Sequence, residues 1–162
     1  MRDTLLRSGY RVAYRLLTVS ALVRRRRGRG VKCVLAHGDS IVLVRHTYGP
    51  RRMWHIPGGG IHRGESTLDA AAREMREELG LDGIQYRLLG QLELRLDHRR
   101  VRVGAVHAEL SSTALTPDPI EIAEARFFAL DALPSPVGAE VRDLVALAFT
   151  SGASGERPRM EE

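Results

Sequence analysis

The amino-acid sequence predicts an α/β sandwich. Runs with strand character follow one another in some places and are separated by helical runs in others. This mixed order argues against a doubly wound sheet, in which strands and helices alternate strictly. The chain has 162 residues, of which 43% are hydrophobic, which suits one domain with its own core. Only 5% of the residues are aromatic, so we expect a core of Leu, Val, Ile and Ala.

The N-terminal segment, up to residue 30, differs from the rest of the chain. Residues 1–23 have the apolar pattern of a helix, with arginines at every fourth position forming one stripe. The run Arg24–Arg27, next to two glycines, is typical of a linker. The helix is apolar around most of its circumference, so we expect it to pack on its own domain or in a homodimer. An anionic membrane surface is the alternative.

The folded domain is predicted over residues 31–150, and it begins with a hairpin. Residues 31–36 and 41–46 are rich in β-branched and apolar residues, and a polar turn separates them. A short strand is expected at 53–56. Pro57 and the three glycines after it then interrupt the strand pattern.

The second half of the domain starts with a helix predicted at Thr67–Leu79, which Ser66 caps and Gly80 ends. The remaining elements are strands at 84–96, 101–110 and 126–130, a turn at 97–100 and a helix at 138–150. Residues 151–162 are small, polar and charged, and we expect a disordered tail there.

The charge balance and the cysteine content narrow the class of protein. A net charge of +5 gives a mild positive field that favours anionic substrates, nucleotides included. Cys33 is the only cysteine and lies in an apolar run, so we interpret it as a small core residue. No apolar stretch reaches the roughly 18 residues of a membrane-spanning helix, and no signal peptide is evident. We therefore expect a cytoplasmic protein.

Three glutamates gather on one side of the predicted helix. A helix advances about 100° per residue, so Glu74, Glu77 and Glu78 share one arc. Carboxylates placed in this way repel one another, whereas a hard divalent cation converts the repulsion into coordination, and oxygen ligands suit Mg²⁺ or Mn²⁺. The adjoining arc is expected to be the buried face of the helix. Its members are Leu68, Ala71, Ala72, Met75 and Leu79.

Taken alone, a Glu-x-x-Glu-Glu pattern is most often a solvated acidic face, and only its surroundings favour a metal site. The glycines at 58–60 allow the backbone to turn tightly and to approach a ligand closely. Glu65 then lies between this loop and the helix. A glycine loop is weak support by itself, but the loop, Glu65 and the acidic helix at these intervals make a strong signal.

The segment from Gly59 to Leu81 resembles the Nudix box at every position that the box defines. The matching residues are Gly59, Glu65, Arg73, Glu74, Met75, Glu77, Glu78, Gly80 and Leu81. The lead-in Trp54–Gly60 and the stretch Glu121–Phe128 followed by Leu133-Pro134 are similar to other parts of the family. The resemblance covers roughly residues 31–149. It implies a mixed β-sheet sandwiched between helices, an α/β/α sandwich.

The resemblance also implies roles for individual residues. Glu74, Glu77 and Glu78 would bind Mg²⁺ or Mn²⁺ together with the Gly58 carbonyl. Arg73 would hold a carboxylate of the box in place. The residues that would form the scaffold of the box are Gly59, Glu65 and Gly80. Glu121 matches the place where many members of the family carry an additional catalytic glutamate.

The chemistry implied is cleavage of a phosphoanhydride by water. Metal ions neutralise the phosphate charge, and Glu74 or Glu121 takes the proton of the attacking water; the sequence leaves both open. Arg45 and Arg52 are candidates for substrate phosphate binding. We interpret Trp54 as scaffold and the histidines at 55 and 62 as surface residues.

Three functions follow from this resemblance. The leading one is hydrolysis of a small nucleotide, such as a (d)NTP or a related nucleoside diphosphate derivative. The second is removal of pyrophosphate from RNA 5′ ends, the only role for nucleic acid that we expect. It ranks lower because no stripe of aromatic and basic residues is apparent. The third is a nucleotide-sensing module without catalysis, which the full set of box glutamates disfavours.

Overall fold

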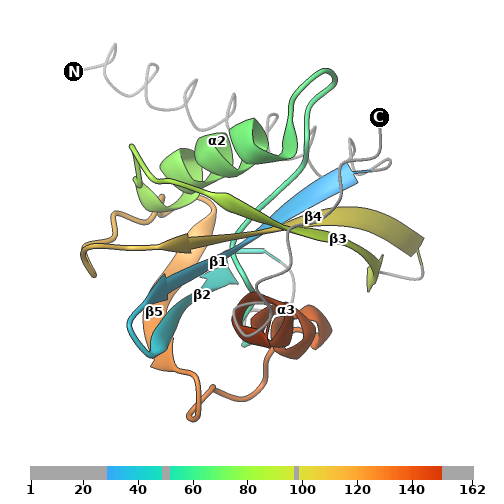
Figure 1. Ribbon diagram of the computed structural model, residues 1–162. Helices are drawn as coiled ribbons and strands as arrows, with labels where there is room; N and C mark the ends of the chain where they lie inside the picture. Colours follow the sequence, from blue (N-terminus) through green and yellow to red (C-terminus); the bar gives the residue numbers. More distant parts are fainter. Residues whose placement is uncertain (1–28, 49–51, 97–98, 151–162) are drawn as a thin grey trace, which may run out of the picture.

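The computed structural model confirms the α/β/α sandwich. It describes residues 29–48, 52–96 and 99–150, with only the backbone at 95–96 and 99–100. A five-stranded sheet lies between two helices, α2 (Thr67–Leu79) on one face and α3 (Ala139–Thr150) on the other (Figure 1). The expected helix at 1–23, the linker before residue 29, and the tail at 151–162 lie outside the described residues. Within those residues, no helix is long and apolar enough to cross a membrane.

The sheet is mixed, and its strand order is β3-β4-β1-β2-β5. Parallel pairing joins β1 to β4, and the other neighbours are antiparallel. The strands are β1 (Arg29–His37), β2 (Ser40–His46), β3 (Arg87–Leu96), β4 (Arg99–Glu109) and β5 (Ile122–Ala129). The hairpin β1–β2 lies near the middle of the sheet, as its continuous apolar runs require, because strands buried on both faces carry apolar residues at every position.

Alternate residues of the strands belong to two different layers of the core. Cys33 and Leu35 of β1 point to the α2 side with Val42 of β2, whereas Val34 and Ile41 point to the α3 side. Cys33 is fully buried in the first layer, which confirms it as a small core residue. The sheet is thus covered on both faces, and α2 and α3 are fixed against it independently.

Helix α2 has the predicted bounds because both of its ends carry capping residues. The Ser66 hydroxyl accepts a hydrogen bond from Asp69 N at 3.1 Å. Gly80 adopts the left-handed conformation, with φ of 66°, and its N–H donates to the Arg76 carbonyl. A side chain at this φ is strained, which explains why glycine ends the helix.

The buried face of α2 differs from the predicted one. Leu68 is 40% exposed and Ala72 is half-buried, whereas Ala70, Glu74 and Glu78 are buried. The helix is rotated so that the stripe containing two of the three glutamates faces inward. Hydrophobicity alone could not show this, because it assigns the inner face to the most apolar arc.

Three other elements also differ from the sequence-based expectation. β3 begins at Arg87 instead of residue 84, and β5 runs from Ile122 to Ala129 instead of 126–130. The longer β5 follows β2 along its whole length, down to the pair His46↔Ile122. The expected strand at 53–56 makes only isolated bridges, Val44↔His55 and Trp54↔Val137.

Candidate active site

The glycine loop fills a gap between two diverging strands. β1 and β2 pair only next to their turn, at Ala36↔Ile41 and His37↔Ser40. Farther from the turn, Cys33 N donates to the Pro57 carbonyl and Val31 N to the Gly59 carbonyl, both at 2.9 Å. On the other side, the backbone of His55 exchanges hydrogen bonds with Val44 of β2. The loop is therefore held by the sheet itself.

Glycine is required at two positions of this loop because other groups come too close for a side chain. Gly58 has a φ of 136°, and a Cβ there would overlap the Val31 carbonyl oxygen. A Cβ at Gly59 would overlap the carboxyl group of Glu74. The loop and α2 thus approach each other closely enough for backbone and carboxylate to share one site.

Glu74 and Glu78 are buried where α2 faces the loop. Their exposed fractions are 1% and 3%, and Glu78 Oε2 accepts a hydrogen bond from Gly58 N at 3.0 Å. Burial raises the pKa of Glu78 to about 8, and the negative charges of Glu74 and Glu121 add to the effect against Lys32 and Gly58 N–H. Burial also raises the pKa of Glu74, although Arg73 opposes it. The positive charges of Arg73 and Lys32 therefore do not offset the effect of burial on these two carboxylates.

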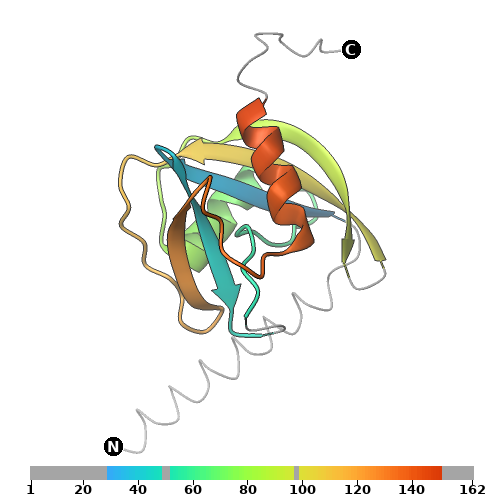
Figure 2. The same cartoon turned by 90° about the horizontal axis from the view of Figure 1, so that it is seen from below.

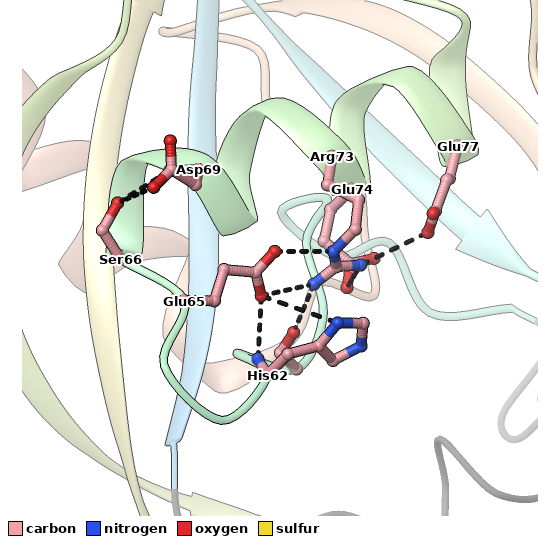
Figure 3. A network of polar contacts seen from close by, with 8 residues as sticks. His62, Glu65, Ser66, Asp69, Arg73, Glu74 and Glu77 are labelled. Atoms are coloured by element: carbon pink, nitrogen blue, oxygen red, sulfur yellow. Dashed lines mark hydrogen bonds and ion pairs between the residues drawn. The ribbon is translucent and has the colours of Figure 1, made fainter.

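Arg73 is the centre of a polar network that ties the box together (Figure 3). Its guanidinium donates to both oxygens of Glu65 at 2.8 and 3.0 Å and to Glu74 Oε1 at 2.8 Å. It also donates to the Gly60 carbonyl at 2.8 Å and to Glu77 Oε2 at 3.3 Å. Loop, helix and carboxylates are therefore fixed by one planar cation.

Glu65 is a structural anchor of the same network. Its Oε2 also accepts a hydrogen bond from His62 N at 2.8 Å. The hydrogen bonds from Arg73 lower the pKa of Glu65 to about 2, so it is ionised and matches the charge of Arg73. Glu65 thus closes the loop at residues 62–65 onto the start of α2, which suits a scaffold residue.

Glu77 lies apart from the two buried glutamates. Its side chain is 59% exposed, and its Oε2 accepts the hydrogen bond from Arg73. Among the residues that the structure describes, no three His, Cys, Asp or Glu side chains form a group that could hold a metal ion. The donor set nevertheless fits a hard cation, because Arg73 and Lys32 compensate the buried oxygens of Glu74 and Glu78 only in part and Glu77 is on the same arc of α2.

Glu121 approaches the same place from β5. It lies directly before that strand, and its carbonyl accepts a hydrogen bond from Thr47 N at 3.0 Å, which ties it to the end of β2. Its charge contributes to the raised pKa of Glu78, so the two carboxylates are neighbours. The tertiary fold therefore brings Glu121 to the box from a distant part of the sequence.

The two candidate arginines have different surroundings. Arg45 stacks on the Trp54 ring, with its Cζ 4.9 Å from the ring centroid, and pairs with Glu124 across β2 and β5. Glu124 also pairs with Arg126. Arg52 is exposed in the segment between β2 and the glycine loop. Arg45 thus already has an aromatic and an acidic partner, and Trp54, 7% exposed, belongs to the core as expected.

Sequence reasoning missed a polar cluster on the α3 side of the loop. His55 Nδ1 and Glu140 Oε1 are 2.9 Å apart, and Glu140 is buried. Lys32 Nζ donates to the Ile56 carbonyl at 2.7 Å. His55 is thus a half-buried partner of Glu140 and not a surface residue. A lone lysine inside an apolar strand was the one available signal, because Lys rarely enters such a run without an acceptor.

Comparison with known proteins agrees with this geometry. A family model described as the NUDIX domain matches residues 24–148. The chain therefore belongs to the Nudix family. A solved structure of a MutT NUDIX hydrolase from Burkholderia pseudomallei superimposes with a TM-score of 0.68 over 75% of this chain and 98% of that chain. At 23% identity, this likeness concerns the fold.

Two curated relatives are similar in sequence. The NAD-capped RNA hydrolase NudC of Pseudomonas aeruginosa is 31% identical over 101 residues, which are 62% of this chain and 36% of the relative. The RNA pyrophosphohydrolase of Acinetobacter baylyi is 38% identical over 76 residues, 44% of this chain and 45% of the relative. The chain spans less than half the length of these relatives.

Proposed function

We propose that this protein hydrolyses the phosphoanhydride bond of a nucleoside diphosphate derivative in a reaction that depends on Mg²⁺ or Mn²⁺. One observation carries the proposal. Glu74 and Glu78 are buried against Gly58 and Gly59 with raised pKa values, although a structural role would favour uncharged or fully paired groups at these positions. Such a site is completed by a divalent cation.

Four groups of the box would hold the cation: the carboxylates of Glu74, Glu77 and Glu78 and the carbonyl of Gly58. When bound, the metal supplies positive charge that offsets the charge of the phosphate oxygens and makes water more acidic. The chain's own contribution is positional. Arg73 keeps one oxygen of Glu74 and the loop carbonyl of Gly60 fixed, so the ligands do not have to be reorganised.

A carboxylate must then accept the proton of the attacking water. Glu74 and Glu121 both qualify, since the charge of each acts on Glu78. Arg73 occupies Oε1 of Glu74 with a hydrogen bond, which leaves that oxygen less accessible to the attacking water. Glu121 approaches from the start of β5 and is not one of the four groups that would hold the cation. We therefore favour Glu121 as the base.

The substrate class has two candidates. A small nucleotide is the first, because the residues of the box alone supply the metal ligands that hydrolysis of a phosphoanhydride needs. An RNA 5′ end is the second, because NudC of Pseudomonas aeruginosa and the RNA pyrophosphohydrolase of Acinetobacter baylyi, to which this chain is similar, act on RNA. A module that only senses nucleotides would not need to keep the three glutamates.

A screen of nucleoside diphosphate derivatives, with capped and triphosphorylated RNA included, tests this function. We expect release of a phosphate product with Mg²⁺ or Mn²⁺ and none with EDTA, while circular dichroism shows an unchanged fold. Asp143→Asn, which removes an exposed carboxylate from α3, should leave the activity unchanged. Turnover that persists in EDTA would refute the metal dependence.

The base is identified by comparing Glu121→Gln with Glu74→Gln. We expect Glu121→Gln to lower kcat by about 10²-fold or more with KM retained, because proton transfer is lost while the metal ligands remain. Glu74→Gln should also weaken the binding of Mn²⁺, which titration calorimetry measures separately. Near-normal kcat in Glu121→Gln would exclude this residue as the base.

A further inference from the structure

A cluster of arginines lies beside the glycine loop and is not used by the proposed chemistry. It consists of Arg29 on β1, Arg63 in the loop after the glycines, and Arg102 on β4, and all three are exposed. We call these three residues the arginine rim. The sequence shows no regular spacing between them, so only the fold reveals the cluster.

Backbone pairing places the members of the rim side by side. Arg29 and Arg102 are direct partners in the parallel ladder between β1 and β4. The bridge Gly30↔Gly60 and the hydrogen bond from Ile61 N to the Arg29 carbonyl, at 3.2 Å, bring the loop against the start of β1. Arg63 follows two residues later. The start of β1 lies on the same side of the molecule as the end of β3 and the start of β4 (Figure 1 and Figure 2).

The rim is on the same face of the sheet as the catalytic carboxylates. Val31, two residues beyond Arg29, belongs to the core layer under α2. Gly104, two residues beyond Arg102, is covered by Thr67, the first residue of α2. Because side chains two positions apart in a strand share a face, Arg29 and Arg102 point to the α2 side, just beyond the N-terminus of that helix. The positive end of the helix dipole adds to their charge.

Few acidic groups face the rim. Glu65 is engaged by Arg73, and Asp69 accepts a hydrogen bond from Ser66. Glu93 is the carboxylate that strand pairing places opposite Arg102. The surroundings of the rim therefore attract a chain of phosphates.

We propose that the arginine rim binds the sugar-phosphate backbone of single-stranded RNA whose 5′ end occupies the box. From Ser66, at the rim, to Glu74 the helix advances eight residues, about 12 Å at 1.5 Å per residue, which a few nucleotides span. Arginine pairs well with phosphate, and backbone contacts of this kind position a substrate without reading its sequence. The inference rests on the proposed function and selects the RNA 5′ end as its substrate.

The test compares two triple variants of the full-length protein. Arg29→Gln, Arg63→Gln and Arg102→Gln together remove the rim. The control removes three exposed arginines from the α3 side, as Arg87→Gln, Arg126→Gln and Arg142→Gln. Arg87 and Arg126 lie opposite His107 and Leu43, which face α3, and Arg142 is on α3 itself. Both variants lose the same net charge.

Binding is measured first, without turnover, by fluorescence anisotropy of a short 5′-triphosphorylated RNA, about 12 nucleotides long, at several salt concentrations in EDTA. We expect the rim variant to raise Kd at least tenfold and to flatten the slope of log K against log salt by about 2, since each lost contact to a single strand contributes about 0.7. The control should change Kd by less than threefold. Equal losses in both variants would show a general charge effect and overturn the proposal.

Turnover gives the second measurement. The rim variant should raise KM for the RNA and leave both kcat and the KM for a dinucleotide substrate unchanged. If the wild type cleaves neither substrate, the proposed function is wrong. The binding measurement still decides whether the arginine rim binds RNA. If the rim variant keeps RNA affinity but loses binding to vesicles rich in phosphatidylglycerol, the rim serves a membrane and the RNA proposal is wrong.

Discussion

The two helices bury glutamates against glycines, and the pKa values of these glutamates move in opposite directions. On α2, Glu74 lies against Gly59, and on α3, Glu140 lies against Gly138 so closely that a Cβ at either glycine would overlap the carboxyl group. Burial raises the pKa of Glu74. Burial alone would also raise the pKa of Glu140, but the hydrogen bond with His55 and the charge of Lys32 outweigh it and lower the pKa below its ordinary value.

The difference separates a reactive arrangement from a structural one. Glu140 is compensated within the protein, because His55 and Lys32 lie on the same side of the glycine loop. Glu74 accepts a hydrogen bond from Arg73, and Glu78 accepts one from Gly58 N–H and is near the charge of Lys32. The two carboxylates also repel each other, and both pKa values remain raised. The protein thus compensates a buried carboxylate fully at Glu140 and incompletely at Glu74 and Glu78, where we propose that a cation binds.

The strongest test of this difference replaces one glutamate on each helix by glutamine. Glu78→Gln should lower kcat/KM by about 10²-fold or more, because it removes a proposed metal ligand, while the melting temperature stays the same or rises as a like charge is lost. Glu140→Gln should keep kcat/KM within about threefold, because that carboxylate is outside the box. Steady-state kinetics and thermal melts of both variants test this prediction. Equal losses of kcat/KM would contradict the distinction between a reactive and a structural glutamate.

Substitution of Gly59 and Gly138, the glycines next to these glutamates, should give a smaller difference in activity and stability. In Gly59→Ala the new methyl group displaces the Glu74 carboxylate, so we expect about a tenfold loss of kcat/KM with little change in stability. In Gly138→Ala the methyl group meets both Glu140 and the His55 ring, and we expect a loss of about 1–3 kcal/mol in unfolding free energy with kcat retained. Urea titrations and kinetics measure the two effects separately, and a purely kinetic defect in Gly138→Ala would contradict this assignment.

The smallest predicted effect concerns acid stability. The folded-state pKa of Glu140 lies below its ordinary value of 4.5, so the ionised form stabilises the protein above that pH and this stability is lost as the pH falls through the folded pKa. Glu140→Ala should cost about 1–3 kcal/mol at pH 7, since His55 loses its partner. The difference from wild type should shrink as the pH falls below 4.5, and urea unfolding at pH 7 and pH 3.5 measures it. A constant difference would rule out this ion pair.

Local signals in the sequence determine much of the fold by themselves. The ends of α2 follow from Ser66 and Gly80, because caps act on neighbouring backbone groups. The first hairpin follows from two apolar runs around a polar turn. The box residues can be identified because glycines and glutamates at fixed intervals on a loop and a helix lie close in space whatever the rest of the chain does.

Tertiary structure decided everything that joins distant segments. The sequence could not show that α2 turns Glu74 and Glu78 inward, since burial of a charge depends on the loop that the diverging strands hold against it. It could not pair Glu140 with His55, which is 85 positions away. The arginine rim depends on the register between β1 and β4. Long-range pairings are fixed by packing and strand register, and neither is encoded in the spacing of residues along one segment.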